Sequence, residues 1–175
     1  MTIDDADFTD WIRHHAGLIH KIAYAYCRNA TDREDVVQEI AAQLWRSRDR
    51  YDERLRETTW VYRVALNVAI SFHRRERRHI EQRASIDDQA VAIAEPVEPS
   101  EDVLFLMRCI GDLGALEKAL VLLYLDGNDH ASIADVLGIS VSNVGTKLFR
   151  IKDKLRVAFE SHARTHDSEK RHAAR

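Results

Sequence analysis

Cysteine, proline and glycine are all scarce in this 175-residue chain, which has two cysteines, two prolines and six glycines. Cys27 and Cys109 lie far apart without a Cys-x-x-Cys pair, so the sequence gives little support to a metal or redox site. His14, His15 and His20 precede Cys27, but their spacing does not bring four ligands to one face. Because aromatic residues are also few, at 7%, the composition favours an all-helical protein over a β-sandwich.

Long apolar runs are missing as well. No stretch approaches the roughly 20 apolar residues of a membrane span, so we expect no membrane insertion. The N-terminus is acidic and lacks the apolar run of a signal peptide, which predicts a cytoplasmic protein. We find no phosphate-binding loop, nucleophile elbow, metal cluster or paired catalytic carboxylates. The sequence therefore predicts neither an enzyme nor a cofactor.

The net charge of −3 conceals strong segregation of charge along the chain. Residues 140–156 carry five basic residues against one acid, and residues 74–78 carry four against one. Residues 81–102 carry seven acids against one basic residue. Because local fields steer binding, two basic segments of this kind are compatible with a nucleic-acid partner.

The N-terminal half is predicted to form three helices. The first is predicted from Asp10 to about Arg28 by its apolar period. Thr31 and Glu34 have the spacing of a capping box, which predicts that a second helix begins there. Residues 46–58 are polar and aperiodic and are expected to form a loop, and a third helix is predicted to begin near Thr59.

The C-terminal half is separated by a change in composition. Residues 80–100 are acidic, contain both prolines and are expected to form a flexible linker. Ser100 is positioned to cap a following helix, and another is predicted from Leu116 to about Asp126. Residues 161–175 lack apolar periodicity and are expected to be a frayed, disordered tail. The predicted fold is all-α, with two small helical domains over 8–79 and 101–160.

Residues 129–156 have the pattern of two helices joined by a tight turn. Gly138 suits the left-handed conformation that ends a helix, and Ser140 can cap the next one. In the second helix one stripe is apolar and the neighbouring stripe is basic: Val144, Leu148, Ile151 and Leu155, beside Asn143, Lys147, Arg150 and Lys154. A helix-turn-helix that enters a DNA major groove needs such a pattern. Amphipathic helices joined through glycine occur in many folds, however, and a basic stripe is often only a solvated face.

Three motifs in order resemble one family. Asp35-Val36-Val37-Gln38-Glu39, followed by Leu44-Trp45, resembles the Asp-Leu-Val-Gln-Glu signature of bacterial sigma factors. Thr59 to Ala69 resembles that family's Thr-Trp-Leu-Tyr-Arg-Ile-Ala-x-Asn segment, and an arginine-rich helix end follows. Residues 133–144 resemble its C-terminal helix-turn-helix. The order and the short linker are similar to the extracytoplasmic-function (ECF) group of RNA polymerase sigma factors, over about residues 8–158.

The resemblance implies a role for each segment. The first domain would be sigma region 2 and the second sigma region 4, and both would act in promoter-specific initiation of transcription. The implied contacts to core RNA polymerase come from Asp35, Gln38 and Glu39. Those that capture and melt the −10 element come from Arg63, Asn67, Arg74, Arg75 and Arg78. Those to the −35 element come from Ser142, Asn143, Thr146, Lys147 and Arg150. The family also implies an anti-sigma partner.

Two departures and two rival readings stay open. Gly145 stands where a basic residue is common in the family, and Asp52, Glu53 and Glu57 stand where small or basic residues are common. These acids put base capture at the −10 element in question. The first rival is a helix-turn-helix regulator that does not join core polymerase, and the second is a helical interaction module without DNA binding.

Overall fold

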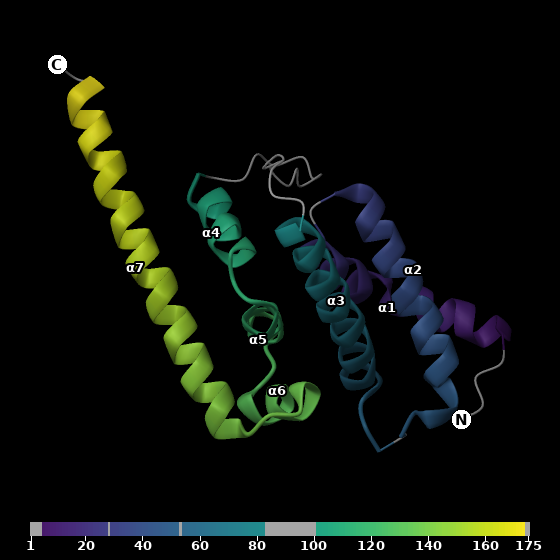
Figure 1. The fold of residues 1–175 in the computed structure, drawn as a ribbon. Coiled ribbons are helices and arrows are strands. Elements are labelled where there is room, and N and C mark those ends of the chain that lie inside the picture. Colours follow the sequence, from purple (N-terminus) through teal and green to yellow (C-terminus); the bar gives the residue numbers. More distant parts are fainter. Residues whose placement is uncertain (1–4, 28, 53, 83–100, 174–175) are drawn as a thin grey trace.

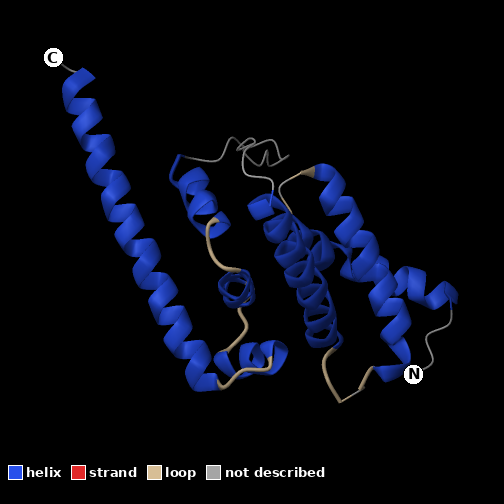
Figure 2. Cartoon of the chain, viewed as in Figure 1, coloured by secondary structure: helices blue, strands red, loops and turns tan. Residues whose placement is uncertain are grey.

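The computed structural model describes residues 5–27, 29–52, 54–82 and 101–173 and is helical throughout, with no strand among these residues (Figures 1 and 2). The elements are α1 (Asp5–Tyr26), α2 (Ala30–Ser47), the 3-10 turn η1 (Arg48–Arg50), α3 (Glu57–Gln82), α4 (Glu101–Gly111), α5 (Ala115–Leu125), α6 (His130–Leu137) and α7 (Val141–Ala173). None of the described helices is long and apolar enough to cross a membrane. The all-α prediction is confirmed.

The first bundle consists of α1, α2 and α3, which pack against one another around a common apolar core. Ile22, Ile40, Leu44 and Val61 are fully buried there. Each comes from the apolar stripe of its helix, as the 3.6-residue period requires. Burial of each large aliphatic side chain contributes about 1.5–3 kcal/mol, so this core holds the outer faces of α2 and α3 in fixed positions.

The helix boundaries differ from the predicted ones in instructive ways. Thr31 does not cap α2; the N-cap is Asn29, whose side-chain oxygen accepts a hydrogen bond of 2.8 Å from the backbone N–H of Asp32. Asparagine is among the best capping residues, and here it precedes the acidic first turn. The other helices of this bundle also begin early, α1 at Asp5 and α3 at Glu57.

The second bundle consists of α4 to α7, with α5 and α6 packed against the first half of α7. Leu120, Leu123 and Ile133 are fully buried and face Val144 and its stripe on α7. Residues 80–82 of the predicted linker belong to α3, while residues 83–100, and with them the predicted Ser100 cap, lie outside the described residues.

The C-terminal helix is longer than the sequence predicted. Helix α7 continues to Ala173, whereas a frayed tail was expected from residue 161. Phe105 of α4 packs against α7 where this extension begins, with its ring centroid 5.0 Å from that of Phe159 and 3.9 Å from that of His162. These contacts support α7 beyond the helix-turn-helix, at positions where no apolar period marked a buried face.

The two bundles lie against each other rather than apart. Helix α3 contacts α5 and α6, and α1 contacts α5, so α5 and α6 lie between α3 and α7 (Figure 1). The buried hydroxyl of Tyr26 donates a hydrogen bond of 2.6 Å to the backbone oxygen of Ala115 at the start of α5. Burial raises the pKa of this hydroxyl, so it remains a donor.

Candidate nucleic-acid interface

The geometry of α6, the turn and α7 is set by three capping contacts. Asp129 accepts a hydrogen bond of 2.7 Å from the N–H of Ser132 at the start of α6. Gly138 ends α6 in the left-handed conformation, with φ of 66°. Ser140 Oγ accepts a hydrogen bond of 3.2 Å from the N–H of Asn143. The predicted glycine stop and serine cap are both confirmed, and together they fix the angle at which α7 begins.

The first turns of α7 present a polar face next to the buried stripe. Ser142, Asn143, Thr146 and Arg150 are exposed and Lys147 is half-buried. Lys147 and Arg150 form no ion pair with any residue that the structure describes, which leaves both cations available to an anionic ligand. The Thr146 hydroxyl instead donates a hydrogen bond of 3.0 Å to the backbone oxygen of Ser142, so only its lone pairs can accept from a ligand.

Phe149 is a surface feature that the sequence reasoning missed. Its side chain is 73% exposed on the same turns of α7 as Thr146 and Arg150. The signal was available, because Phe149 is apolar but lies outside the stripe formed by Val144, Leu148 and Ile151. An exposed ring on this face can make apolar contact with a thymine methyl group.

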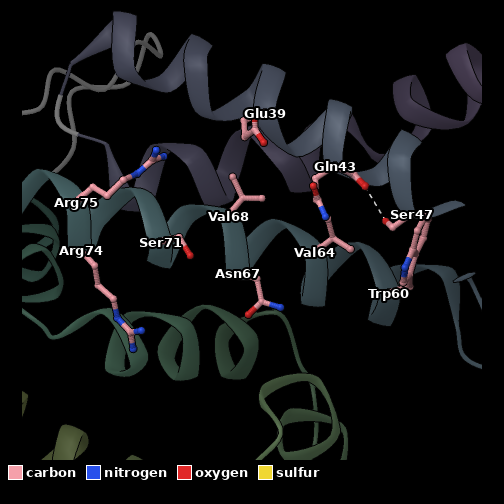
Figure 3. Close-up of a pocket in the computed structure, with 10 residues that line it drawn as sticks. All are labelled: Glu39, Gln43, Ser47, Trp60, Val64, Asn67, Val68, Ser71, Arg74 and Arg75. Atoms are coloured by element: carbon pink, nitrogen blue, oxygen red, sulfur yellow. Dashed lines mark hydrogen bonds between the residues drawn. The ribbon is translucent and has the colours of Figure 1, made fainter.

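A second site is a groove of about 710 Å³ between α2 and α3 (Figure 3). Its lining residues are Glu39, Gln43, Ser47, Trp60, Val64, Asn67, Val68, Ser71, Arg74 and Arg75. Three predicted DNA contacts, Asn67, Arg74 and Arg75, thus line one groove with Glu39 of α2. Arg75 points toward α2, whereas the side chains of Asn67 and Arg74 point away from it (Figure 3). Cations beside amide and hydroxyl groups are a combination that can hold a nucleic-acid backbone and an unpaired base.

The acidic face of α2 is accessible. Asp35, Gln38 and Glu39 are all exposed. Glu39 forms an ion pair of 2.6 Å with Arg46, which lies seven residues further along the same helix. Both groups of this pair are more than half exposed, so the pair contributes little to stability and can be exchanged for an external partner.

Arg63 does not line the groove, although the sequence grouped it with Asn67 and Arg74. Its guanidinium faces α6, where Nη2 lies 2.6 Å from Oδ1 of Asp135. For Arg78, only the helical backbone is described, and its side chain lies outside the described residues. The predicted −10 set is therefore divided between the groove and the surface that contacts the second bundle.

Aromatic rings support the segment between η1 and α3. Trp60 is buried and its ring centroid lies 5.1 Å from that of Tyr51 and 5.4 Å from that of Trp11. Trp11 Nε1 in turn donates a hydrogen bond of 3.1 Å to Glu57. This cluster holds the start of α3, and with it one end of the groove, against α1.

Two of the three acids in this segment are engaged by neighbours. Asp52 forms an ion pair of 3.0 Å with Arg54, whose hydrogen bonds lower the pKa of the carboxyl group. Glu57 accepts from Trp11 and lies 3.4 Å from His15 Nε2, while Glu53 lies outside the described residues. The negative charge of the segment is therefore partly compensated before any DNA arrives.

His15 is a buried titratable group beneath this segment. Its side chain is 5% exposed, and burial lowers its pKa from 6.5, against the opposing hydrogen bond with Glu57. The unfolded chain consequently binds a proton more readily than the folded chain. The contribution of His15 to stability is therefore complete above pH 6.5, and it is lost as the pH falls through the unfolded pKa toward the lowered folded pKa.

Two protein-family models match the chain. The Sigma-70 region 2 model matches residues 11–79, and the Sigma-70 region 4 model matches residues 106–155. The first range falls within the α1–α3 bundle and the second within the α4–α7 bundle. The chain therefore pairs both regions in the order that the sequence motifs predicted.

Curated relatives and solved structures point the same way. The ECF RNA polymerase sigma factor SigE of Mycolicibacterium smegmatis is 28% identical over 93% of this chain and 66% of its own length. SigW of Bacillus subtilis is 23% identical over 87% of this chain and 89% of its own length. The sigma factor RpoE of Bartonella quintana, solved with the anti-sigma factor NepR, superposes with a TM-score of 0.73 at 17% identity, covering 88% of this chain and 97% of RpoE. CnrH, solved with the cytosolic domain of CnrY, superposes with a TM-score of 0.64 at 20% identity, covering 90% of each chain.

A regulator that uses only a helix-turn-helix is not favoured by these matches, because residues 11–79 match a Sigma-70 region 2 model in addition to the region 4 match of the helix-turn-helix. The motifs, the two bundles and the matches agree, and the chain belongs to the ECF group of bacterial RNA polymerase sigma factors.

Proposed function

We propose that this protein binds core RNA polymerase through α2 and directs it to promoters by reading a −10 element with α3 and a −35 element with α7. The observation that carries the proposal is that one chain presents two separate basic surfaces together with an exposed acidic helix face. The proposed role is regulatory and not catalytic, and it would be exercised in the cytoplasm.

Polymerase docking is assigned to Asp35, Gln38 and Glu39 of α2. All three are exposed, and Glu39 also lines the α2–α3 groove, which supports a polymerase contact on α2 next to the DNA that α3 would hold. A protein interface of this kind needs a rigid patch with charge complementarity, and the buried stripe of α2 provides the rigidity.

Melting of the −10 element is assigned to the α2–α3 groove and to the residues that flank it. Unstacking a base costs a few kcal/mol, so a melting surface must bind the exposed base and backbone to compensate. Asn67 and Ser71 offer hydrogen bonds, while Arg74 and Arg75 offer charge to the phosphates. Arg63 and Arg78 extend the same role along α3.

The −35 element is assigned to the first turns of α7, which would enter the major groove with Ser142, Asn143, Thr146, Lys147 and Arg150. Asn143 suits an adenine edge, while Lys147 and Arg150 suit guanine edges or phosphates. A single helix-turn-helix buries little area, so the free protein would bind DNA weakly. Joining two weak DNA contacts on one polymerase would raise the effective concentration of the second contact.

We further propose an anti-sigma partner. The RpoE and CnrH structures are complexes with NepR and with the cytosolic domain of CnrY, and a partner of this class would cover the same surfaces of regions 2 and 4 here. Isolation of this protein from unstressed native cells should recover such a partner. If nothing is recovered, control lies elsewhere, for example in transcription of its own gene.

Reconstituted transcription tests the central proposal. The purified protein is mixed with bacterial core polymerase and fragmented genomic DNA from its host, and RNA 5′ ends are sequenced. We expect discrete start sites that share two upstream elements. The proposal is overturned, and the regulator alternative takes its place, if the protein neither binds core polymerase nor starts transcription. A second experiment addresses the interaction module: loss of promoter activity when the basic residues of α7 are removed would argue against a module that does not bind DNA.

A further inference from the structure

Glu57, the first residue of α3, is held by two side chains of α1. It follows the described residues of 48–56, which join α2 to α3 and which we call the connecting segment. Trp11 Nε1 donates a hydrogen bond of 3.1 Å to Glu57 Oε2, and His15 Nε2 lies 3.4 Å from the same oxygen. Because a carboxylate oxygen accepts hydrogen bonds, the imidazole carries the hydrogen of this pair on Nε2. We call Trp11, His15 and Glu57 the α1 clamp.

The two donors of the α1 clamp are themselves fixed in position. His15 is buried, and its ring centroid lies 4.5 Å from that of Trp11. The Trp11 ring in turn lies 5.4 Å from the ring of Trp60, which is also buried. Close-packed side chains of this kind have little freedom to change rotamer, so α1 sets the position of Glu57.

The connecting segment rests on the same aromatic cluster. The Tyr51 ring lies 5.1 Å from the Trp60 ring, and the Tyr51 hydroxyl donates a hydrogen bond of 2.7 Å to the backbone oxygen of Leu55. The N–H of Leu55 donates to the backbone oxygen of Asp52 at 2.9 Å. The segment is therefore supported by Trp60 before its end and by the α1 clamp directly after it.

The connecting segment carries exposed arginines beside the α2–α3 groove. Arg50, Arg54 and Arg56 are exposed, and Arg50 and Arg56 form no ion pair with any residue that the structure describes. Ser47, which precedes the segment, and Trp60, which supports it, both line the groove (Figure 3). A DNA strand whose unstacked bases enter the groove would therefore pass along the segment, where arginines can bind its phosphates.

We propose that Glu57 is a positioning residue for −10 recognition, which fixes the connecting segment in the arrangement that accepts the preferred bases. The inference rests on the proposed reading of the −10 element by α3. Glu57 acts through the segment and not through contact with DNA, since its Oε2 is engaged by α1. A firmly held segment discriminates between bases because it cannot rearrange around an ill-fitting one. The α1 clamp also gives a structural reason for an acid at position 57, where small or basic residues are common in the family.

Two substitutions of Glu57 separate positioning from charge. Glu57→Gln removes the charge but keeps an oxygen that can accept from Trp11 and His15, whereas Glu57→Ala removes both. Asp49→Ala is the matched control, because Asp49 is an exposed acid of the same segment that forms no ion pair or side-chain hydrogen bond with the described residues. Hydrogen–deuterium exchange of each full-length protein, without DNA, measures how firmly the segment is held.

The amides to follow are those of Leu55, Thr59 and Trp60, which donate to backbone oxygens at the end of the segment and the start of α3. We expect them to exchange about fivefold faster in Glu57→Ala than in the wild-type protein, because the hydrogen bonds of the α1 clamp are lost. Glu57→Gln and Asp49→Ala should exchange at the wild-type rate. Unchanged exchange in Glu57→Ala would overturn the positioning role.

Transcription from a promoter library tests the effect on recognition. Each protein, with core RNA polymerase, transcribes a promoter recovered by the genomic experiment in which the −10 positions are randomised, and the transcripts are counted by sequencing. The measured quantity is the ratio of the preferred base to the mean of the other three at the most selective position. We expect this ratio to fall about fivefold in Glu57→Ala and to stay within about twofold of the wild-type value in Glu57→Gln and Asp49→Ala. Inactive protein lowers all transcripts equally, so a merely destabilised variant leaves the ratio unchanged.

The outcomes distinguish this inference from the proposed function. Equal effects of Glu57→Gln and Glu57→Ala would mean that charge matters and not position, and an unchanged base ratio in Glu57→Ala would mean that the segment does not select bases. Either result overturns the inference alone. A wild-type protein that shows no −10 preference overturns the proposed reading of the −10 element, and this inference with it.

Discussion

Two glycines of the helix-turn-helix should respond to the same substitution with opposite signs. Gly145 lies inside α7, and a Cβ atom there would meet the His130 ring at 3.7–3.8 Å, which is ordinary van der Waals contact. Gly145→Ala should therefore raise the free energy of unfolding by about 1 kcal/mol, the difference in helix propensity between alanine and glycine. Gly138 has φ of 66°, and alanine in that conformation costs about 1–2 kcal/mol.

Thermal unfolding followed by circular dichroism measures both effects. For a chain of this size, 1 kcal/mol shifts the midpoint by about 2–4 °C. We expect Gly145→Ala to raise the midpoint by that amount and Gly138→Ala to lower it by as much or more. The reasoning is refuted if both variants shift in the same direction, because backbone conformation alone separates them: neither added Cβ would meet an atom closer than 3.4 Å.

The remaining predictions concern polymerase, DNA and pH. Asp35→Arg with Glu39→Arg should abolish capture of core polymerase in a pull-down without changing helix content, because both side chains are exposed on α2. Lys147→Ala with Arg150→Ala should remove −35 dependence of transcription, and if both contact phosphates it should reduce the slope of log affinity against log salt by about 2. The melting temperature of the wild-type protein should fall as the pH drops below 6.5, and His15→Phe should reduce that fall, since the buried imidazole has its pKa lowered by burial.

Each of these has a control on the same chain. Asp10→Arg with Asp153→Arg reverses two exposed acids away from α2 and should leave polymerase capture intact. Lys152→Ala with Arg156→Ala removes two cations beyond the recognition turns of α7 and should preserve −35 dependence. His20→Phe makes the same substitution at an exposed position of α1 and is the matched control for the pH profile. A control that behaves like its test variant would mean that charge or bulk, and not position, causes the effect.

The fold was predictable where local rules act alone. The apolar stripes of α2, α3 and α7, the Gly138 stop and the Ser140 cap all follow from spacing and from the chemistry of single residues. The start of α2 was assigned to Thr31 because Thr31 and Glu34 have the spacing of a capping box. In the structure Asn29 has the extended backbone of an N-cap and its side chain takes that role, which the spacing alone did not indicate. Phe105 of α4 contacts His162 at the start of the α7 extension, and a contact with another helix leaves no signal in the local pattern of α7.

The candidate site was predictable in its parts but not in its arrangement. Sequence spacing placed Arg63, Asn67 and Arg74 on one stripe of α3. In the structure this stripe contributes to two surfaces, because Asn67 and Arg74 line the groove next to α2 whereas Arg63 contacts α6. The partner of Arg63 lies 72 residues further along the chain, and nothing in the local pattern of Asp135 distinguishes it from a solvated acid. Contacts of this range are set by tertiary packing.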